Sequence, residues 1–95
     1  MSTSIKVPDL AASRLAAIIA GTYKGGNDLR SLDALVRRGL VVLTDRDATL
    51  ADEYRYRRAG ESVAVTALGI AWVRTQPALL AWIEANRTER CLLPA

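Results

Sequence analysis

The feature that most constrains the fold is an amphipathic segment over residues 28–38 that runs directly into a short apolar segment. Its apolar residues recur at spacings that place them on one face of a helix: Leu29, Leu32, Leu35 and Val36. Gly39 stands where a left-handed C-cap residue belongs, so the helix is predicted to end there. Residues 40–43 are all apolar and predict a short buried strand. A helix followed at once by a strand indicates a mixed α+β fold.

A second periodic segment, over residues 53–66, predicts a β-hairpin with a two-residue turn at residues 59–60. In this register tyrosines and valines share one face of the sheet and arginines share the other, as cross-strand packing favours. The expected cross-strand pairs are Tyr54 with Val65 and Tyr56 with Val63. Together with residues 40–43, the hairpin predicts a three-stranded antiparallel sheet.

Helices are expected on both sides of this central region. Asp9 is a suitable N-cap for a helix that ends at Gly21. Thr66 is predicted to cap a helix that follows the hairpin, and Pro77 suits the first turn of a last helix that reaches about residue 90. The sequence leaves open whether residues 67–90 form one bent helix or two.

The length of the chain predicts a single domain, because 95 residues hold only one hydrophobic core. We expect a flexible arm over residues 1–8, the folded domain over residues 9–75, and a C-terminal helix and tail over residues 76–95. No apolar run reaches the roughly 18 residues that a membrane-spanning helix needs. A cytoplasmic protein without a membrane partner is therefore expected.

Composition argues against enzyme chemistry. The chain has no histidine, which removes the usual general base and the commonest metal ligand. Its single cysteine, Cys91, excludes an internal disulfide and a thiolate zinc cluster. We therefore expect a binding or regulatory domain that is not an enzyme and that has no cofactor and no metal.

Two segments carry a family resemblance. Leu32–Val41 reads Leu-Asp-Ala-Leu-Val-Arg-Arg-Gly-Leu-Val, and Val63–Gly69 reads Val-Ala-Val-Thr-Ala-Leu-Gly. Their order resembles the winged helix-turn-helix domain of bacterial and phage regulators, loosely of the MarR or PadR type. In that family the first segment ends the recognition helix and enters the sheet, and the second closes the wing and starts the next helix. The likeness covers roughly residues 10–75.

The resemblance implies a small winged-helix domain of the α+β class, with a three-stranded antiparallel wing sheet and one or more C-terminal helices. It also implies duplex DNA as the partner, bound through the helix at 28–38 and the wing at 53–66. The glycine-rich loop over residues 22–27 departs from the compact turn that normally precedes the recognition helix.

The first candidate DNA-binding surface is the polar face of helix 28–38. Arg30 and Ser31, at its N-terminal end, are expected to meet base edges, because arginine matches the paired acceptors of guanine. Arg37 and Arg38 are expected to contact phosphate, or else only to interact with the helix dipole. Asp33 lies on the same face and would repel phosphate, so a merely solvated face remains the alternative. Lys24, in the preceding loop, is a candidate phosphate contact.

The second candidate surface is the wing. Arg55 and Arg57 share one face of the predicted hairpin and Arg58 lies near its tip, where the three could straddle a phosphate backbone. The alternative is an ordinary polar face of a one-sided sheet, with Arg58 paired to Glu61.

The third candidate surface is a homodimer interface formed by Trp72, Trp82 and Ile83. Regulators of this kind often pair through helices that follow the wing, and a short chain has a limited core of its own. The alternative is that both tryptophans close the core of their own domain. The apolar tail, residues 91–95, is unusual for a free end.

The preferred interpretation is a DNA-binding transcriptional regulator of bacterial or phage type. The alternative is a winged-helix protein-interaction module that binds no nucleic acid. A net charge of only +3, from 13 basic and 10 acidic residues, the position of Asp33 and the apolar C-terminus favour the alternative. The two differ in whether the arginines of helix 28–38 and of the wing converge on one side of the molecule.

Overall fold

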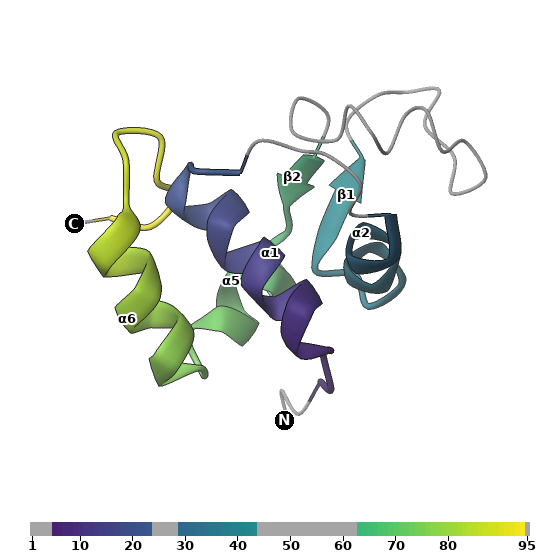
Figure 1. Cartoon of the computed structure of the whole chain (residues 1–95). Coiled ribbons are helices and arrows are strands. Elements are labelled where there is room, and N and C mark those ends of the chain that lie inside the picture. Colours follow the sequence, from purple (N-terminus) through teal and green to yellow (C-terminus); the bar gives the residue numbers. More distant parts are fainter. Residues whose placement is uncertain (1–4, 24–28, 44–62, 95) are drawn as a thin grey trace.

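The computed structural model describes residues 5–23, 29–43 and 63–94 of the chain. Within these ranges it contains four helices and one antiparallel pair of strands (Figure 1). The elements in chain order are α1 (Asp9–Ala20), α2 (Leu29–Arg37), β1 (Val41–Leu43), β2 (Val63–Val65), α5 (Ala67–Val73) and α6 (Pro77–Asn86). The predicted α+β class is confirmed. None of the described helices is both long enough and apolar enough to span a bilayer.

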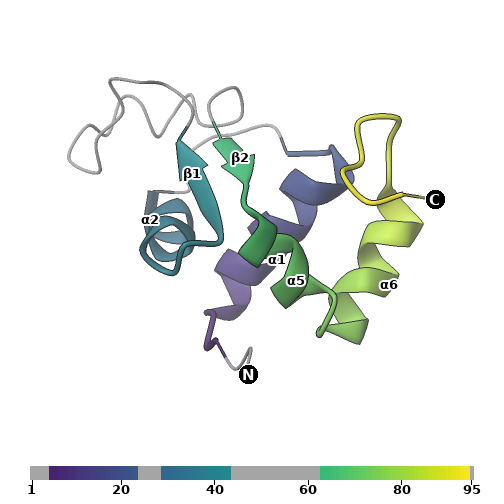
Figure 2. The same cartoon turned by 180° about the vertical axis from the view of Figure 1, so that it is seen from behind.

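Helix α1 forms the centre of the molecule. It packs against α2 and against α6, which lie on opposite sides of it in both Figure 1 and Figure 2. Leu15 and Ile19 are completely buried on this helix. The N-cap is Pro8, without a side-chain hydrogen bond, so the prediction that Asp9 caps the helix is wrong by one residue. Asp9 lies in the first turn instead, where its carboxylate interacts favourably with the helix dipole.

Helices α1 and α2 both end at a left-handed glycine, as predicted. Gly21 has a φ of 88° and Gly39 has a φ of 73°. After α2, the amide of Gly39 donates to the carbonyl of Val36 at 3.0 Å, and the amide of Leu40 donates to that of Leu35 at 3.0 Å. These two bonds form a Schellman motif, which satisfies carbonyls that the helix leaves free and directs the chain into β1.

The sheet pairs the strand that follows α2 with the strand that precedes α5. Strand β1 pairs antiparallel with β2 in the register Val41 with Val65, Val42 with Ala64 and Leu43 with Val63. The strand predicted over residues 40–43 is present from Val41 onward, but it is not buried throughout, because Val42 is 48% exposed. The remainder of the expected hairpin, residues 53–62, lies outside the described residues, so the predicted third strand is not described. The sheet of the described residues has two strands.

Thr66 connects this sheet to α2 and α5. Its hydroxyl accepts from the amide of Gly69 at 3.0 Å, which confirms the predicted N-cap of α5. The same hydroxyl lies 2.6 Å from the carbonyl oxygen of Gly39 and 3.0 Å from that of Leu40. The amide of Thr66 also donates to the carbonyl of Leu40 at 3.0 Å. The end of α2 is thus fixed to the start of α5.

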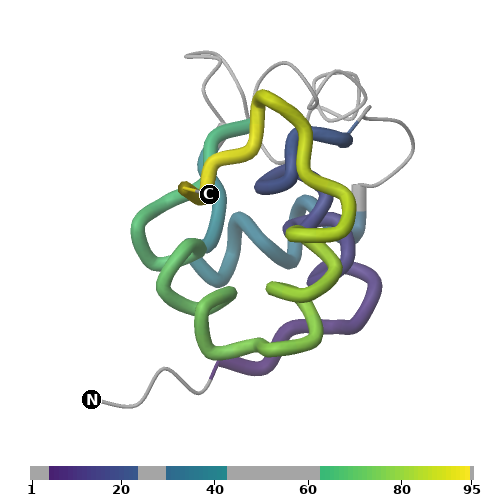
Figure 3. The backbone as a smooth tube through the Cα atoms, turned by 90° about the vertical axis from the view of Figure 1, so that its left-hand side faces the viewer, coloured from purple at the N-terminus to yellow at the C-terminus, as the bar shows by residue number. Residues whose placement is uncertain are grey.

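The C-terminal region contains two helices, which answers the question that the sequence left open. Helix α5 ends before Arg74, and α6 begins with Pro77 at its first position, as predicted. Helix α6 ends at Asn86, about one turn earlier than expected, because the chain becomes extended at Arg87. The following residues turn back toward α1 (Figure 3).

The C-terminal segment, residues 87–94, covers the end of α1. The amide of Thr88 donates to the carbonyl of Ala20 at 2.9 Å, and the amide of Leu92 donates to that of Ile19 at 2.8 Å. Cys91 and Leu93 pack against the core. The apolar side chains of Cys91 and Leu93 therefore belong to the protein's own fold, whereas that of Leu92 is 53% exposed.

Residues 5–8, at the end of the expected arm, contact the folded domain. Ile5 and Val7 pack against the core. The indole nitrogen of Trp72 donates to the carbonyl of Ile5 at 3.1 Å, and the guanidinium of Arg38 donates to the carbonyl of Lys6 at 2.6 Å. From Ile5 onward this segment therefore links α2 with α5.

Candidate nucleic-acid interface

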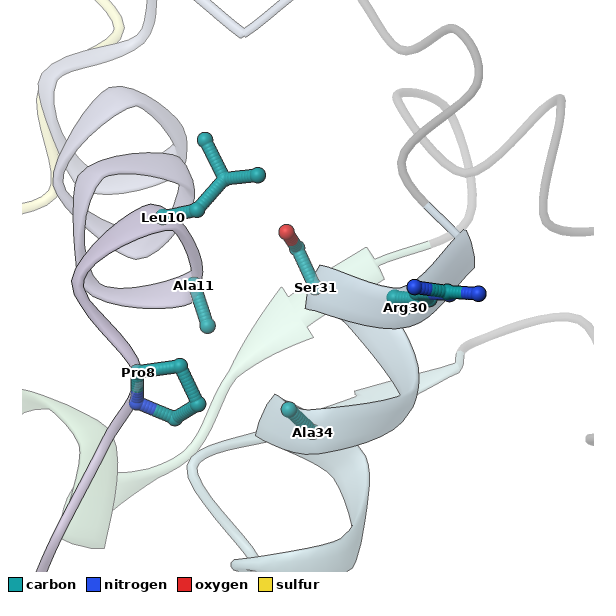
Figure 4. A pocket seen from close by; sticks show the side chains of 6 residues that line it. All are labelled: Pro8, Leu10, Ala11, Arg30, Ser31 and Ala34. Carbon is teal, nitrogen blue, oxygen red and sulfur yellow. The ribbon is translucent and has the colours of Figure 1, made fainter.

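The buried and exposed faces of α2 agree with the prediction except at Ser31. Leu32 and Leu35 are completely buried, as the apolar periodicity predicts. Ser31 is only 4% exposed, so the prediction that it lies on the open face is wrong. Serine is small enough to pack where α2 faces the first turn of α1, and Figure 4 shows its side chain pointing toward that helix. A buried Ser31 cannot reach the edge of a base.

Arg30 is an exposed cation at the start of α2. It is exposed in the first turn of the helix, and Figure 4 shows its side chain extending away from α1. Within the part of the chain that the structure describes, Arg30 forms no ion pair. Its guanidinium thus offers a fork of donors with the geometry of a guanine edge or a phosphate.

A hollow of about 260 Å³ lies between Arg30 and the start of α1. It is lined by Pro8, Leu10, Ala11, Arg30, Ser31 and Ala34 (Figure 4). Leu10 is 58% exposed, although it is a large apolar residue. This hollow was not predicted from the sequence. Its sequence signal is an apolar residue, Leu10, directly after Asp9 in the first turn of α1.

Arg37 is exposed at the end of α2, but its charge is partly compensated. Its Nε atom donates to Oδ2 of Asp33 at 2.8 Å, one helical turn earlier. The Arg37 side chain is 68% exposed and that of Asp33 is 36% exposed, so the pair is open to solvent and readily exchanged for another partner. The positive charge that α2 presents at this end is therefore smaller than its arginines suggest.

Arg38 has a structural role that the sequence did not indicate. Its Nε atom donates to the carbonyl of Lys6 at 2.6 Å and its Nη1 atom donates to the carbonyl of Ala34 at 2.9 Å. The side chain therefore adds a donor to a carbonyl in the last turn of α2 and fixes the N-terminal segment beside it. One Nη1 donor and the two Nη2 donors have no partner among the described residues.

The remaining basic candidates are not described. Lys24 of the glycine-rich loop and Arg55, Arg57 and Arg58 of the wing lie outside the described residues. The expected convergence of the wing arginines with those of α2 is therefore not tested by the structure.

The predicted dimer interface does not exist as one surface. Trp72 is 4% exposed and Ile83 is 1% exposed, and both belong to the protein's own core. The prediction that these two residues meet a second copy is wrong, because neither reaches the surface. Trp82 is different: it is 42% exposed on the outer side of α6.

Among the residues that the structure describes, no three acidic or cysteine side chains are close enough together to hold a metal ion. Comparisons with protein-family models, with curated proteins and with solved structures found no match.

Proposed function

We propose that this protein is a DNA-binding transcriptional regulator of bacterial or phage type, and that the N-terminal turn of α2 reads duplex DNA. The observation that carries the proposal is the placement of Arg30. It is exposed and unpaired among the described residues, in the first turn of an amphipathic helix that leads directly into an antiparallel sheet. In helix-turn-helix proteins this turn of the recognition helix contacts base edges.

The proposed role of each arginine follows from the hydrogen bonds and ion pairs that its side chain forms. Arg30 reads a base, because its guanidinium has no partner among the described residues and can offer two parallel donors to the two acceptors of a guanine edge. Arg37 contacts phosphate after exchanging its exposed partner Asp33, a pair that stabilises the fold by at most about 1 kcal/mol. Arg38 keeps α2 and the N-terminal segment in a fixed relation, and that fixed relation sets the angle at which α2 approaches the groove.

The winged-helix fold itself is part of the proposal. It adds the wing over residues 53–66, with Arg55, Arg57 and Arg58 as phosphate contacts, and Lys24 as a further contact. With roughly four to six phosphates neutralised, the logarithm of affinity falls with the logarithm of salt concentration at a slope of about −4 to −5.

A polarisation titration tests the proposal. A labelled random-sequence duplex is titrated with the full chain at low salt, with Arg30→Ala and with Arg90→Ala. Arg90 is the matched control because it is an exposed arginine beside the end of α1, in the tail that follows α6. We expect binding by the wild type and by Arg90→Ala, and weaker binding by Arg30→Ala. No binding to any duplex at about 50–100 mM salt would refute the proposal.

The second candidate function is a protein-interaction module, and the hollow beside Leu10 favours it. An exposed leucine next to an apolar depression suits an apolar anchor of a partner protein better than it suits a phosphate backbone. A partner that stays bound in high salt and is lost on Leu10→Asp substitution would favour this function over DNA binding.

A further inference from the structure

The hollow between α1 and α2 contains a hydroxyl group that has no partner among the described residues. Ser31 lines the hollow and is only 4% exposed. Figure 4 shows its hydroxyl oxygen on the side of the residue that faces Leu10. This hydroxyl forms no hydrogen bond within residues 5–23, 29–43 and 63–94. Buried polar side chains normally have a partner, so the Ser31 hydroxyl points to a polar group that enters the hollow from outside.

The hollow around this hydroxyl is small, and its walls are apolar. Four apolar residues form the walls: Pro8, Leu10, Ala11 and Ala34. Its volume of about 260 Å³ is below the roughly 300–1,000 Å³ of sites that enclose a small-molecule ligand. The hollow therefore suits a single side chain that a larger partner presents, and it offers that side chain one hydrogen-bonding group at Ser31.

We propose that the hollow binds a tyrosine side chain of a partner protein, from a segment in which a carboxylate lies beside the tyrosine. The ring lies between Leu10 and Ala34, the phenolic hydroxyl pairs with Ser31, and the neighbouring carboxylate pairs with Arg30. This proposal rests on the second candidate function, which it deepens by naming the chemistry of the partner. It does not require DNA binding.

The Ser31 hydroxyl selects tyrosine among the possible anchors. An aliphatic side chain or a phenylalanine would remove the hydroxyl from water without replacing its hydrogen bond, which costs about tenfold in affinity. A charged side chain would itself lose its water among apolar walls that supply no opposite charge. The phenol combines an apolar ring with a hydroxyl that both donates and accepts, so it meets both requirements.

The charges beside the hollow select an acidic neighbour for the tyrosine. The Arg30 side chain extends away from α1, and its guanidinium forms no ion pair within the described part of the chain. It therefore lies outside the hollow, where it is reached by a residue next to the anchor and not by the anchor itself. Asp9 precedes Leu10 and adds a negative charge on the α1 side. The partner's carboxylate thus belongs on the α2 side, next to Arg30.

An NMR titration of the ¹⁵N-labelled full chain tests the site, with a blocked tripeptide of glutamate, tyrosine and glutamate as the probe. We expect weak binding, because the peptide supplies only one anchor, with shifts of the amide signals of Leu10, Ala11, Ser31 and Ala34. The same peptide with phenylalanine in place of tyrosine should bind about tenfold more weakly. No shift at these residues, or equal affinities of the two peptides, would overturn the proposal.

Variants assign each preference to its residue. Ser31→Ala should bind the tyrosine and phenylalanine peptides alike. Arg30→Ala should bind the glutamate peptide and a version with glutamine at both ends alike, whereas the wild type should prefer glutamate by up to about fivefold. Ser13→Ala is the matched control, because it removes an exposed hydroxyl of α1 and should keep both preferences. A Ser31→Ala variant that still prefers tyrosine would overturn the proposal. The comparison of peptides on the wild type needs no variant, so the test stands if Ser31→Ala does not fold.

The outcome is separable from that of both candidate functions. No DNA is present, so a failed titration leaves the polarisation test of Arg30 unaffected. A partner protein that is lost on Leu10→Asp substitution, together with no binding of the tyrosine peptide, would retain the interaction module and overturn the tyrosine site. Binding of free 4-methylphenol, with no gain in affinity from the peptide, would place a small ligand in the hollow and overturn the protein partner.

Discussion

Gly69 lies where α5 meets the sheet most closely, and replacing it with alanine tests the packing that holds α2 in place. A Cβ atom at this position would come within 2.8 Å of Val65 Cγ1 and 3.2 Å of the carbonyl carbon of Leu40, and closer still to the Leu40 carbonyl oxygen. That oxygen cannot easily move, since it accepts from the amide of Thr66 at 3.0 Å. The closest contact is thus with fixed backbone, and the Val65 side chain limits the space further.

Two effects of opposite sign decide the outcome for Gly69→Ala. Alanine favours a helix over glycine by up to about 1 kcal/mol. Overpacking a tight contact costs about 1–3 kcal/mol. Because the closest obstructing atom belongs to the backbone, we expect the overpacking cost to exceed the helical gain and the free energy of unfolding to fall by about 1–2 kcal/mol. For a domain of this size, the melting temperature should fall by roughly 5–15 °C.

Thermal unfolding followed by far-UV circular dichroism measures this effect, with urea unfolding as an independent check. Ala71→Gly is the control, because Ala71 is exposed on the same helix and reports the helical preference alone. That variant should lose at most about 1 kcal/mol. If Gly69→Ala were as stable as the wild type or more stable, the close approach of α5 to Leu40 would be refuted.

Three further predictions follow from the contacts. Thr66→Ala should lower the free energy of unfolding by about 1–2 kcal/mol in urea unfolding, because it removes the N-cap of α5, whereas Thr66→Ser should retain most of the stability. Gly21→Ala should cost more than about 1 kcal/mol in the same measurement, because the residue has a φ of 88° and its new Cβ would come within 2.9 Å of Arg90 Cβ. If DNA is bound, Arg37→Ala should reduce the magnitude of the salt slope by about 1 in polarisation titrations, without changing which sequence is preferred. Full stability of Thr66→Ala or Gly21→Ala, or an unchanged salt slope, would contradict the corresponding contact.

The ends of the helices were predicted well where a single residue determines the local backbone conformation. Gly21 and Gly39 end helices because glycine adopts positive φ without strain, and both positions were predicted. Thr66 and Pro77 begin helices for equally local reasons, a side-chain acceptor and a fixed φ. These features depend on the neighbouring residues only, so they can be read directly from the chain.

Features that depend on tertiary contacts were not predictable in the same way. Ser31 lies on the polar side of the α2 pattern, yet it is buried because the first turn of α1 packs over it. Trp72 and Ile83 are large apolar residues of the kind found in interfaces, but they fill the protein's own core. Of the three predicted interface residues, only Trp82 reaches the surface. The periodicity of apolar residues predicts the face of the helix on which a side chain lies. It does not predict which other segment packs over that face.

The C-terminal tail shows the same limit. Its apolar residues favoured a partner protein in the sequence analysis, but Cys91 and Leu93 pack on the core while the backbone of Thr88 and Leu92 caps α1. Hydrogen bonds between segments about 70 residues apart leave no periodic pattern, so this cap could not be predicted from the sequence.

Selection of bound duplexes is the most direct test of the central proposal, which is that Arg30 reads a base. Genomic fragments are captured in parallel by the wild type, Arg30→Ala and Arg90→Ala, and the enriched sequences are compared. We expect the wild type and Arg90→Ala to enrich the same motif, and Arg30→Ala to lose its preference at one guanine position, with a cost of about 1–3 kcal/mol there. An Arg30→Ala variant that enriches the wild-type motif unchanged would contradict the assignment.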